Sequence, residues 1–231
     1  MDIKTYSLGQ LQANCYLLTQ DKKCIIIDPA DEAHFLLELM QRERLELMAL
    51  VATHGHFDHI MAAGEIQASL DVPFYIHEKD IFLVKRLNQT AKYFLGHDPG
   101  VFAPRNVKHF DLGDSGVSSF PRMTIPPFSF QVIYTPGHTP GSVCLLFEKQ
   151  SVSDGRTPGV TGTGSPGVKE DRPNGILFSG DTLFKNGIGR YDFSYSSYDD
   201  LQESLKRLSK LPSNTRVLSG HGDETTIGDE L

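Results

Sequence analysis

The sequence contains no tryptophan, only three cysteines, and no apolar run long enough to cross a membrane. Cys15, Cys24 and Cys144 are scattered and odd in number, and each lies in an apolar, strand-like run. This placement favours buried thiols over disulfides or metal ligands. The first residues form neither a basic segment nor a long apolar one, so we expect no secretory signal. We therefore predict a cytoplasmic protein that is not associated with a membrane.

Basic residues are outnumbered by acidic ones, 22 to 29, so the formal net charge of the 231 residues is −7 with neutral histidines. This balance argues against a uniformly basic surface for nucleic acid and leaves a local basic patch open. Hydrophobic residues make up 39% of the sequence and charged residues 22%, which is typical of a globular protein with ample material for a core. We predict one domain over residues 1–231, and the sequence leaves its oligomeric state open.

Hydrophobic periodicity predicts strands and helices in two halves of similar organisation. The predicted strands are Ile3–Ser7, Tyr16–Thr19, Cys24–Asp28, Leu47–Thr53, Phe74–His77, Phe130–Thr135, Val143–Phe147, Ile176–Ser179 and Arg216–Ser219. The predicted helices are Ala33–Arg44, Ile60–Leu70, Lys79–Leu95 and Tyr198–Leu211. We infer an α/β (α+β) fold in which two sheets pack face to face and helices cover their outer sides.

Residues 151–175 differ from the rest of the chain in composition. They include six glycines, three prolines and no aromatic residue, with three valines as the only larger aliphatic side chains. Such a segment cannot bury enough apolar surface to offset its ordering entropy. We predict a flexible insertion at the tip of a hairpin between Val143–Phe147 and Ile176–Ser179. The alternative interpretation is a functional lid over the site.

Metal-binding side chains are concentrated in four short loops, each directly after a predicted strand. The seven candidates are His54, His56, Asp58, His59, His138, Asp181 and His221. Imidazole and carboxylate ligands without thiolates suit zinc, iron or manganese. One tetrahedral site needs only four ligands, so seven candidates indicate two adjacent metals that share a carboxylate. The other histidines, His34, His77, His97 and His109, lack this context.

The spacing within the first loop predicts how the ligands divide between the two metals. His54 and His56 are two residues apart, so in extended backbone their side chains point the same way and reach one metal. His138 would complete that site. A second metal alongside would take Asp58, which lies where the chain turns into the following helix, and Asp181 would bridge the pair.

His59 and His221 complete the predicted second site. Water between paired metals loses a proton near neutral pH and becomes a hydroxide nucleophile. We therefore predict a hydrolytic centre in which Asp58 and Asp181 are the catalytic carboxylates.

The four loops resemble those of the metallo-β-lactamase superfamily, in the same order and over nearly the whole sequence except the insertion. Within it, the stretch Gly180–Phe193 is most similar to glyoxalase II-like (hydroxyacylglutathione hydrolase-like) hydrolases. The resemblance implies a four-layer αββα sandwich and the same two-metal ligand division. It also implies that Asp28 is a buried acid that steadies the ligand loop from behind.

The resemblance further implies a dinuclear metallohydrolase whose bridging hydroxide attacks a thioester carbonyl, with S-acylglutathione as the expected substrate. Zinc is the expected metal, and iron or manganese are alternatives. Arg190 falls where the family has a basic residue for the glutathione carboxylate, so Arg190 and Tyr191 are the candidate substrate-binding residues. Arg190 could equally be structural and pair with Asp192. The tyrosines of the family pattern are replaced here by Asp192 and Asp223.

Two alternatives of different chemistry remain open at this point. Persulfide dioxygenases resemble the same family and hold a single iron, which here would use His54, His138 and Asp181. A promiscuous hydrolase of lactones, β-lactams or phosphodiesters would use the same hydroxide. Glyoxalase II enzymes have a further helical domain that helps to hold glutathione; we expect none after His221, and therefore a wider pocket.

Overall fold

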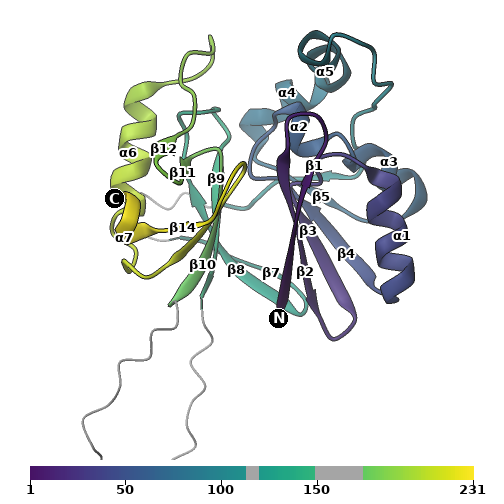
Figure 1. Ribbon diagram of the computed structural model, residues 1–231, viewed down its shortest axis with the longest axis horizontal. Coiled ribbons are helices and arrows are strands. Elements are labelled where there is room, and N and C mark those ends of the chain that lie inside the picture. Colours follow the sequence, from purple (N-terminus) through teal and green to yellow (C-terminus); the bar gives the residue numbers. More distant parts are fainter. Residues whose placement is uncertain (113–119, 149–173) are drawn as a thin grey trace, which may run out of the picture.

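Two six-stranded sheets lie face to face in the computed structural model, which describes residues 1–112, 120–148 and 174–231 (Figure 1). The first sheet has the order β1 (Asp2–Leu8), β2 (Ala13–Gln20), β3 (Lys23–Ile27), β4 (Glu46–Val51), β5 (Phe74–Tyr75) and β6 (Val107–Lys108). The second has the order β14 (Thr225–Thr226), β13 (Arg216–Ser219), β10 (Gly175–Gly180), β9 (Val143–Glu148), β8 (Phe128–Tyr134) and β7 (Arg122–Ile125). The short strands β11 (Leu183–Phe184) and β12 (Gly187–Ile188) pair with each other.

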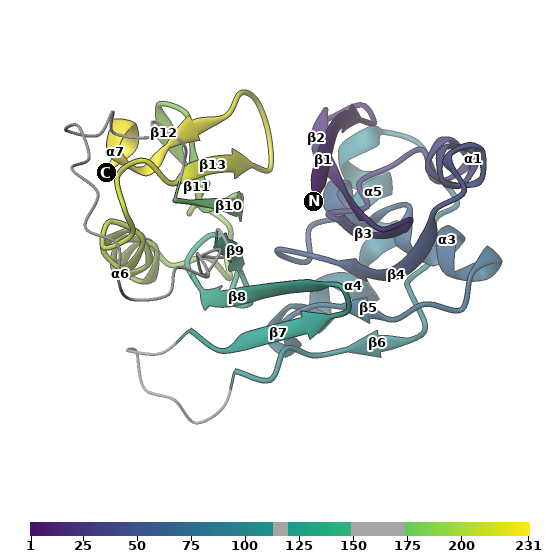
Figure 2. The same cartoon turned by 90° about the horizontal axis from the view of Figure 1, so that it is seen from below.

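Helices cover the outer side of each sheet (Figure 2). The helices on the side of the first sheet are α1 (Ala33–Glu43), α2 (Phe57–Ile60), α3 (Ala63–Ser69), α4 (Ile81–Lys85) and α5 (Leu87–Leu95), with a 3-10 turn at Glu78–Asp80. Those on the side of the second are α6 (Tyr198–Leu208) and α7 (Ile227–Glu230). The chain thus has the four-layer αββα architecture that the resemblance implied.

The side chains of β3 point alternately to the two faces of the first sheet, which explains why both faces are covered by apolar layers. Successive strand residues point to opposite faces, so Ile25 and Ile27 enter the apolar cluster between the two sheets. Cys24 and Ile26 enter the cluster that packs under α1 and α3. All four are fully buried, and each isoleucine contributes about 1.5–3 kcal/mol by leaving water. A strand of the core therefore needs apolar residues at every position, which is what the sequence shows.

The side chains of the second sheet are divided between two apolar clusters in the same way. Phe130 and Val132 of β8 face the cluster between the sheets, whereas Ile133 joins the cluster beneath α6. Cys144 lies in that outer cluster, and Cys15 and Cys24 lie in the corresponding one of the first sheet. The three thiols are free and buried, as predicted.

Two predicted helices are divided in the structure. The single helix predicted over Lys79–Leu95 was wrong: α4 and α5 are separated at Arg86, whose φ of −100° and ψ of 9° are not α-helical. The break lets Leu83 and Val84 on one side, and Leu87 on the other, all be buried. The helix predicted over Ile60–Leu70 likewise begins earlier, as α2, and restarts as α3.

The predicted insertion falls mostly on residues outside the described part of the chain. Of residues 151–175, only Asn174 and Gly175 are described, and Gly175 already belongs to β10. The flanking strands β9 and β10 pair antiparallel, which agrees with the predicted hairpin. Within the described ranges, no helix has both the length and the apolar character needed to cross a membrane.

Candidate metal centre

Four loops at the carboxyl ends of strands carry the seven predicted ligands to one place. His54, His56, Asp58 and His59 follow β4, and His138 follows β8. Asp181 follows β10, and His221 follows β13. Ligand sites of open α/β sheets form at this edge because the loops that leave neighbouring strands meet there.

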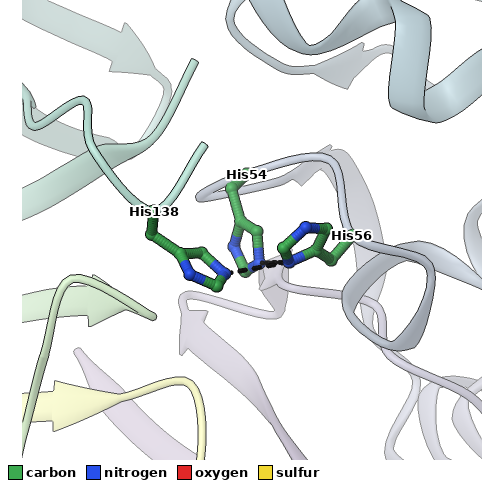
Figure 3. Close-up of side chains that lie close together, drawn as sticks. All are labelled: His54, His56 and His138. Carbon is green, nitrogen blue, oxygen red and sulfur yellow. Dashed lines mark hydrogen bonds between the residues drawn. The ribbon is translucent and has the colours of Figure 1, made fainter. Parts of the chain in front are cut away.

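Three imidazoles form the first group (Figure 3). His54 Nε2 lies 3.1 Å from His56 Nδ1, and His56 Nδ1 lies 2.9 Å from His138 Nε2. Nitrogens bound to one tetrahedral zinc at roughly 2.0–2.1 Å would lie about 3.3 Å apart. The observed spacing is therefore compatible with one cation shared by His54, His56 and His138.

Asp58, His59 and His221 form the second group. His221 Nε2 lies 3.3 Å from His59 Nε2 and 3.3 Å from Asp58 Oδ2. Asp181 faces both groups, because its Oδ2 is 3.5 Å from His138 Nε2 and its Oδ1 is 3.4 Å from His59 Nε2. Asp181 Oδ1 is buried without a hydrogen-bond partner among the described residues. An unsatisfied buried carboxylate oxygen aimed between imidazoles fits a cation as its partner.

In four of these histidines, the ring nitrogen that points away from the other ligands has a hydrogen-bond partner, which fixes the orientation of the ring. His138 Nδ1 donates to the carbonyl oxygen of Arg190 over 2.8 Å, and a carbonyl can only accept. His59 Nδ1 similarly faces Asp28 Oδ2 at 3.1 Å. His54 Nδ1 faces Thr53 Oγ1 at 3.1 Å, and His56 Nε2 faces the hydroxyl of Tyr195 at 2.8 Å. Histidines that bind a metal through one ring nitrogen usually make a hydrogen bond of this kind through the other.

Electrostatics favour cations at this position. Burial, and then the neighbouring imidazoles, hold the pKa of His54 and of His56 well below its ordinary value, so both rings are neutral and offer a lone pair. At His59 burial lowers the pKa, but Asp181, Asp58 and Asp28 outweigh it and raise the pKa to about 10. Three carboxylates around one buried imidazole create a field that a divalent cation would neutralise.

Comparison with known proteins identifies the family. A family model described as "Metallo-beta-lactamase superfamily" matches residues 8–152 and 150–221. The chain belongs to the metallo-β-lactamase superfamily. It is therefore a metal-dependent hydrolase by family, with side-chain clusters suited to divalent metals.

Several curated members of the superfamily are similar over their whole length. The chain is 34% identical to an uncharacterized protein of Aquifex aeolicus, over 100% of this chain and 94% of that protein. It is 32% identical to the probable metallo-hydrolase YqgX of Bacillus subtilis, over 95% and 90% of the two chains. It is 30% identical to the hydroxyacylglutathione hydrolase GloC of Haemophilus influenzae, over 100% and 95%.

Solved structures of the superfamily have the same fold. The BLEG-1 B3 metallo-β-lactamase is 32% identical, with a TM-score of 0.77 over 99% of this chain and 95% of that chain. TTHA1623 in a di-iron-bound form is also 32% identical, with a TM-score of 0.75 over 98% and 96%. One of these proteins is a metallo-β-lactamase and the other holds two iron ions, so the superfamily match leaves the metal and the substrate of this chain to be proposed.

Asp28 supports the first ligand loop from below. Its carboxylate accepts hydrogen bonds from the backbone N–H of Thr53 at 2.7 Å and from Thr53 Oγ1 at 2.8 Å, and it contacts His59 Nδ1. Asp28 is fully buried at the end of β3. One carboxylate therefore fixes both the start of the loop and the ring of His59.

Asp80 is a buried carboxylate that the sequence analysis did not single out. It accepts hydrogen bonds from Gly55 N at 2.8 Å, from Gly141 N at 2.7 Å and from Thr139 Oγ1 at 2.7 Å. Burial raises the pKa of Asp80 although these three donors oppose the shift. Asp80 thus joins the loop that carries His54 and His56 to the loop that carries His138.

Gly220 shows why glycines accompany the ligands. A Cβ at this position would lie 2.1 Å from Asp181 Oδ1 and 2.7 Å from His59 Cε1, far inside contact distance. Any side chain at residue 220 would therefore displace two ligands. Glycine is therefore required at position 220, where the backbone approaches two ligands closely.

A cavity of about 410 Å³ opens over the ligands, a size typical of small-molecule sites. Five of the predicted ligands line it, namely His56, Asp58, His138, Asp181 and His221, together with aromatic side chains such as Phe94, Phe193 and Tyr195. Arg190 lines the cavity, but its guanidinium makes two 2.9 Å bonds to Asp192 and lies over the ring of Phe193. Both roles considered for Arg190 are therefore compatible with its position.

Tyr191, the other candidate for substrate binding, lies apart from this cavity. Its ring packs against Tyr198, with 4.8 Å between the ring centroids, and it is 48% exposed. Among the described residues, those that line the cavity include Arg190 and Phe193 but not Tyr191. The structure gives no support to a direct contact between Tyr191 and a substrate there.

His77 lies outside both ligand groups and is a structural histidine. It is buried, its Nδ1 accepts from Lys79 N at 3.1 Å, and its ring stacks on Tyr134. Burial, and then the charge of Lys79, lower the pKa of His77 to about 4. The folded state therefore keeps this ring neutral down to about pH 4, whereas the unfolded chain protonates it near pH 6.5.

We expect His77 to make folding less favourable as the pH falls from 6.5 towards 4. In this window the unfolded state binds more protons, so the free energy of unfolding decreases with acidification. Asparagine does not titrate in this range and can still accept the hydrogen bond from Lys79 N. The free energy of unfolding of His77→Asn should therefore fall by about 1–2 kcal/mol less than that of the wild type when the pH is lowered from about 7 to about 5. Urea unfolding at both pH values measures this difference, and equal losses in the two proteins would contradict it.

Proposed function

We propose that this chain is a dinuclear metal-dependent hydrolase of thioesters, with S-acylglutathione as the substrate class. The observation that carries the proposal is Asp181, whose two oxygens face two separate ligand groups. The full set of seven side chains supports two metals over one. The similarity to a relative named hydroxyacylglutathione hydrolase supports the choice of substrate.

The residues of the chain have distinct roles in the proposed reaction. His54, His56 and His138 would hold one divalent ion, Asp58, His59 and His221 would hold the other, and Asp181 would contribute to both sites. When bound, such ions lower the pKa of water towards neutrality and polarise a carbonyl oxygen. Zinc is the proposed metal, and the di-iron form of a 32% identical structure keeps iron as the alternative.

Asp58 is placed to accept the proton that the attacking water loses, since Asp58 lines the cavity. Burial raises the pKa of Asp58, but the charge of His59 and the hydrogen bond from His221 outweigh it and hold the pKa well below the ordinary range. The thiol leaves readily as a thiolate because its pKa is only about 8.5. Water and thioester thus yield a carboxylic acid and a thiol.

Hydrolysis of S-lactoylglutathione by the zinc-loaded protein tests the proposal. We expect turnover, and we expect the His54→Ala, His56→Ala double variant to lose at least about 1,000-fold, because it lacks two ligands of one ion. A His34→Ala, His97→Ala double variant is the matched control, since both of these histidines are exposed. Absence of turnover in wild-type protein with two bound metals would overturn the thioester assignment.

A β-lactam is the second candidate substrate. It is favoured by the 32% identity to the BLEG-1 B3 metallo-β-lactamase. The same ligand groups would serve, because a β-lactam carbonyl is attacked in the same way. Parallel assays with a chromogenic cephalosporin separate the two candidates, since the better substrate has the larger kcat/KM.

A further inference from the structure

Tyr195 combines a contact to a predicted ligand with a place in the cavity wall. Its hydroxyl lies 2.8 Å from His56 Nε2. Its ring stacks on Phe193 at 5.4 Å between centroids and meets the edge of Phe82 at 5.4 Å. Packing on two sides holds the phenol in place, and Tyr195 lines the same cavity as His56 and Asp58.

The direction of the hydrogen bond from His56 decides what the phenol can do. His56 Nδ1 is the nitrogen that faces His54 Nε2 and His138 Nε2, so Nδ1 is the atom available to a metal. A neutral imidazole that uses Nδ1 as a ligand carries its proton on Nε2. His56 Nε2–H therefore donates to the oxygen of Tyr195.

The phenol keeps its own proton in this arrangement. A tyrosine hydroxyl donates one hydrogen bond and accepts others, and it stays protonated at neutral pH. Since the bond with His56 uses only the acceptor side, the O–H of Tyr195 is free to turn towards the cavity. A donor at the edge of a largely apolar wall is suited to an oxygen of a bound substrate.

We propose that Tyr195 is a further catalytic residue, whose O–H donates a hydrogen bond to the oxygen of the scissile carbonyl. This inference rests on the proposed hydrolytic function and adds a protein donor to it. The bond strengthens as negative charge develops on that oxygen, so it stabilises the transition state more than the bound substrate. No proton is transferred from Tyr195, and the phenol is unchanged at the end of the reaction.

The Tyr195→Phe variant removes this donor and keeps the ring packing. With S-lactoylglutathione and saturating zinc, we expect kcat to fall roughly 10- to 100-fold with a smaller change in KM. The Tyr198→Phe variant is the matched control, because Tyr198 is half exposed and lies three residues further along. Its kcat should equal that of the wild type.

Acetate binding gives a readout that does not require turnover. Acetate is a carboxylate like the acid product, and its oxygen would take the place of the carbonyl oxygen. Calorimetry on the zinc-loaded proteins should show acetate bound roughly 10-fold or more weakly by Tyr195→Phe than by the wild type. Metal content should stay the same in both proteins.

Three results would overturn the inference. The first is equal acetate affinity in Tyr195→Phe and the wild type, and the second is equal kcat. The third is loss of metal from the variant at saturating zinc, which would make Tyr195 a positioning residue for His56 only. If instead the wild type hydrolyses no thioester while acetate affinity still depends on Tyr195, the proposed substrate fails and the donor assignment stands.

Discussion

The Asp181→Ala variant is expected to lose both metal ions together and at least about 1,000-fold in kcat/KM. Asp181 Oδ2 faces His138 and Asp181 Oδ1 faces His59, so one substitution removes a ligand from each group. It also removes the carboxylate that would lie between two cations and reduce their repulsion. Metal analysis after dialysis against metal-free buffer, followed by assay with S-lactoylglutathione, measures both losses.

The Asp223→Asn variant is the matched control for charge. Asp223 is an exposed carboxylate two residues beyond His221, and it pairs with Lys185 on the surface. It should retain metal content and activity at the wild-type level. If Asp181→Ala kept one metal bound tightly and lost only the other, the bridging role would be wrong and Asp181 would belong to a single site.

The Asp80→Ala variant is expected to be destabilised by about 3–5 kcal/mol, because it leaves three donors without an acceptor in a buried site. Those donors are Gly55 N, Gly141 N and Thr139 Oγ1. Since these bonds join the two loops of the first ligand group, metal affinity should also fall about 10- to 100-fold.

Urea unfolding and a competitive zinc titration measure the two effects of Asp80→Ala. The control is Glu78→Ala, an exposed carboxylate in the same 3-10 turn, which should change neither quantity beyond about 0.5 kcal/mol. Asp80→Asn keeps one acceptor oxygen and should lie between the wild type and Asp80→Ala. A destabilised Asp80→Ala protein with unchanged zinc affinity would show that Asp80 supports the fold but does not position the ligands.

The sequence was sufficient for the fold class and for the ligand loops because both depend on local patterns. Continuous apolar runs such as Cys24–Ile27 mark strands that are buried on both faces, and the same kind of run in β4 leads directly into the first ligand loop. His54 and His56 are neighbours in sequence and in space, so their convergence could be inferred directly.

Other features depend on contacts between distant segments and left little trace in the sequence. Asp80 lies in an ordinary polar stretch, and its partners Gly55 and Gly141 lie 25 and 61 residues away. Tyr195 is 139 residues from His56. An amphipathic pattern could have indicated that Asp80 is buried, but the 3-10 turn Glu78–Asp80 has only three residues, which is too short to show one.

Tertiary packing also overrode local helical preference. The stretch from Lys79 to Leu95 has helical spacing throughout, yet Arg86 leaves the helical conformation so that two shorter helices can each bury an apolar face. The strand β7 was not predicted because its four residues are mostly exposed or half-buried, with only Ile125 buried. Strands of two residues, such as β11 and β12, are set by their pairing partners and not by their own composition.

The seven side chains are expected to bind two metal ions, and native mass spectrometry of the zinc-reconstituted protein counts these ions. Two zinc ions per chain are expected, and none in a variant that lacks both His54 and Asp181. A chain that holds a single ion at saturating metal would contradict this expectation. A single iron ion in the protein as purified, before any zinc is added, would favour the mononuclear dioxygenase interpretation over hydrolysis.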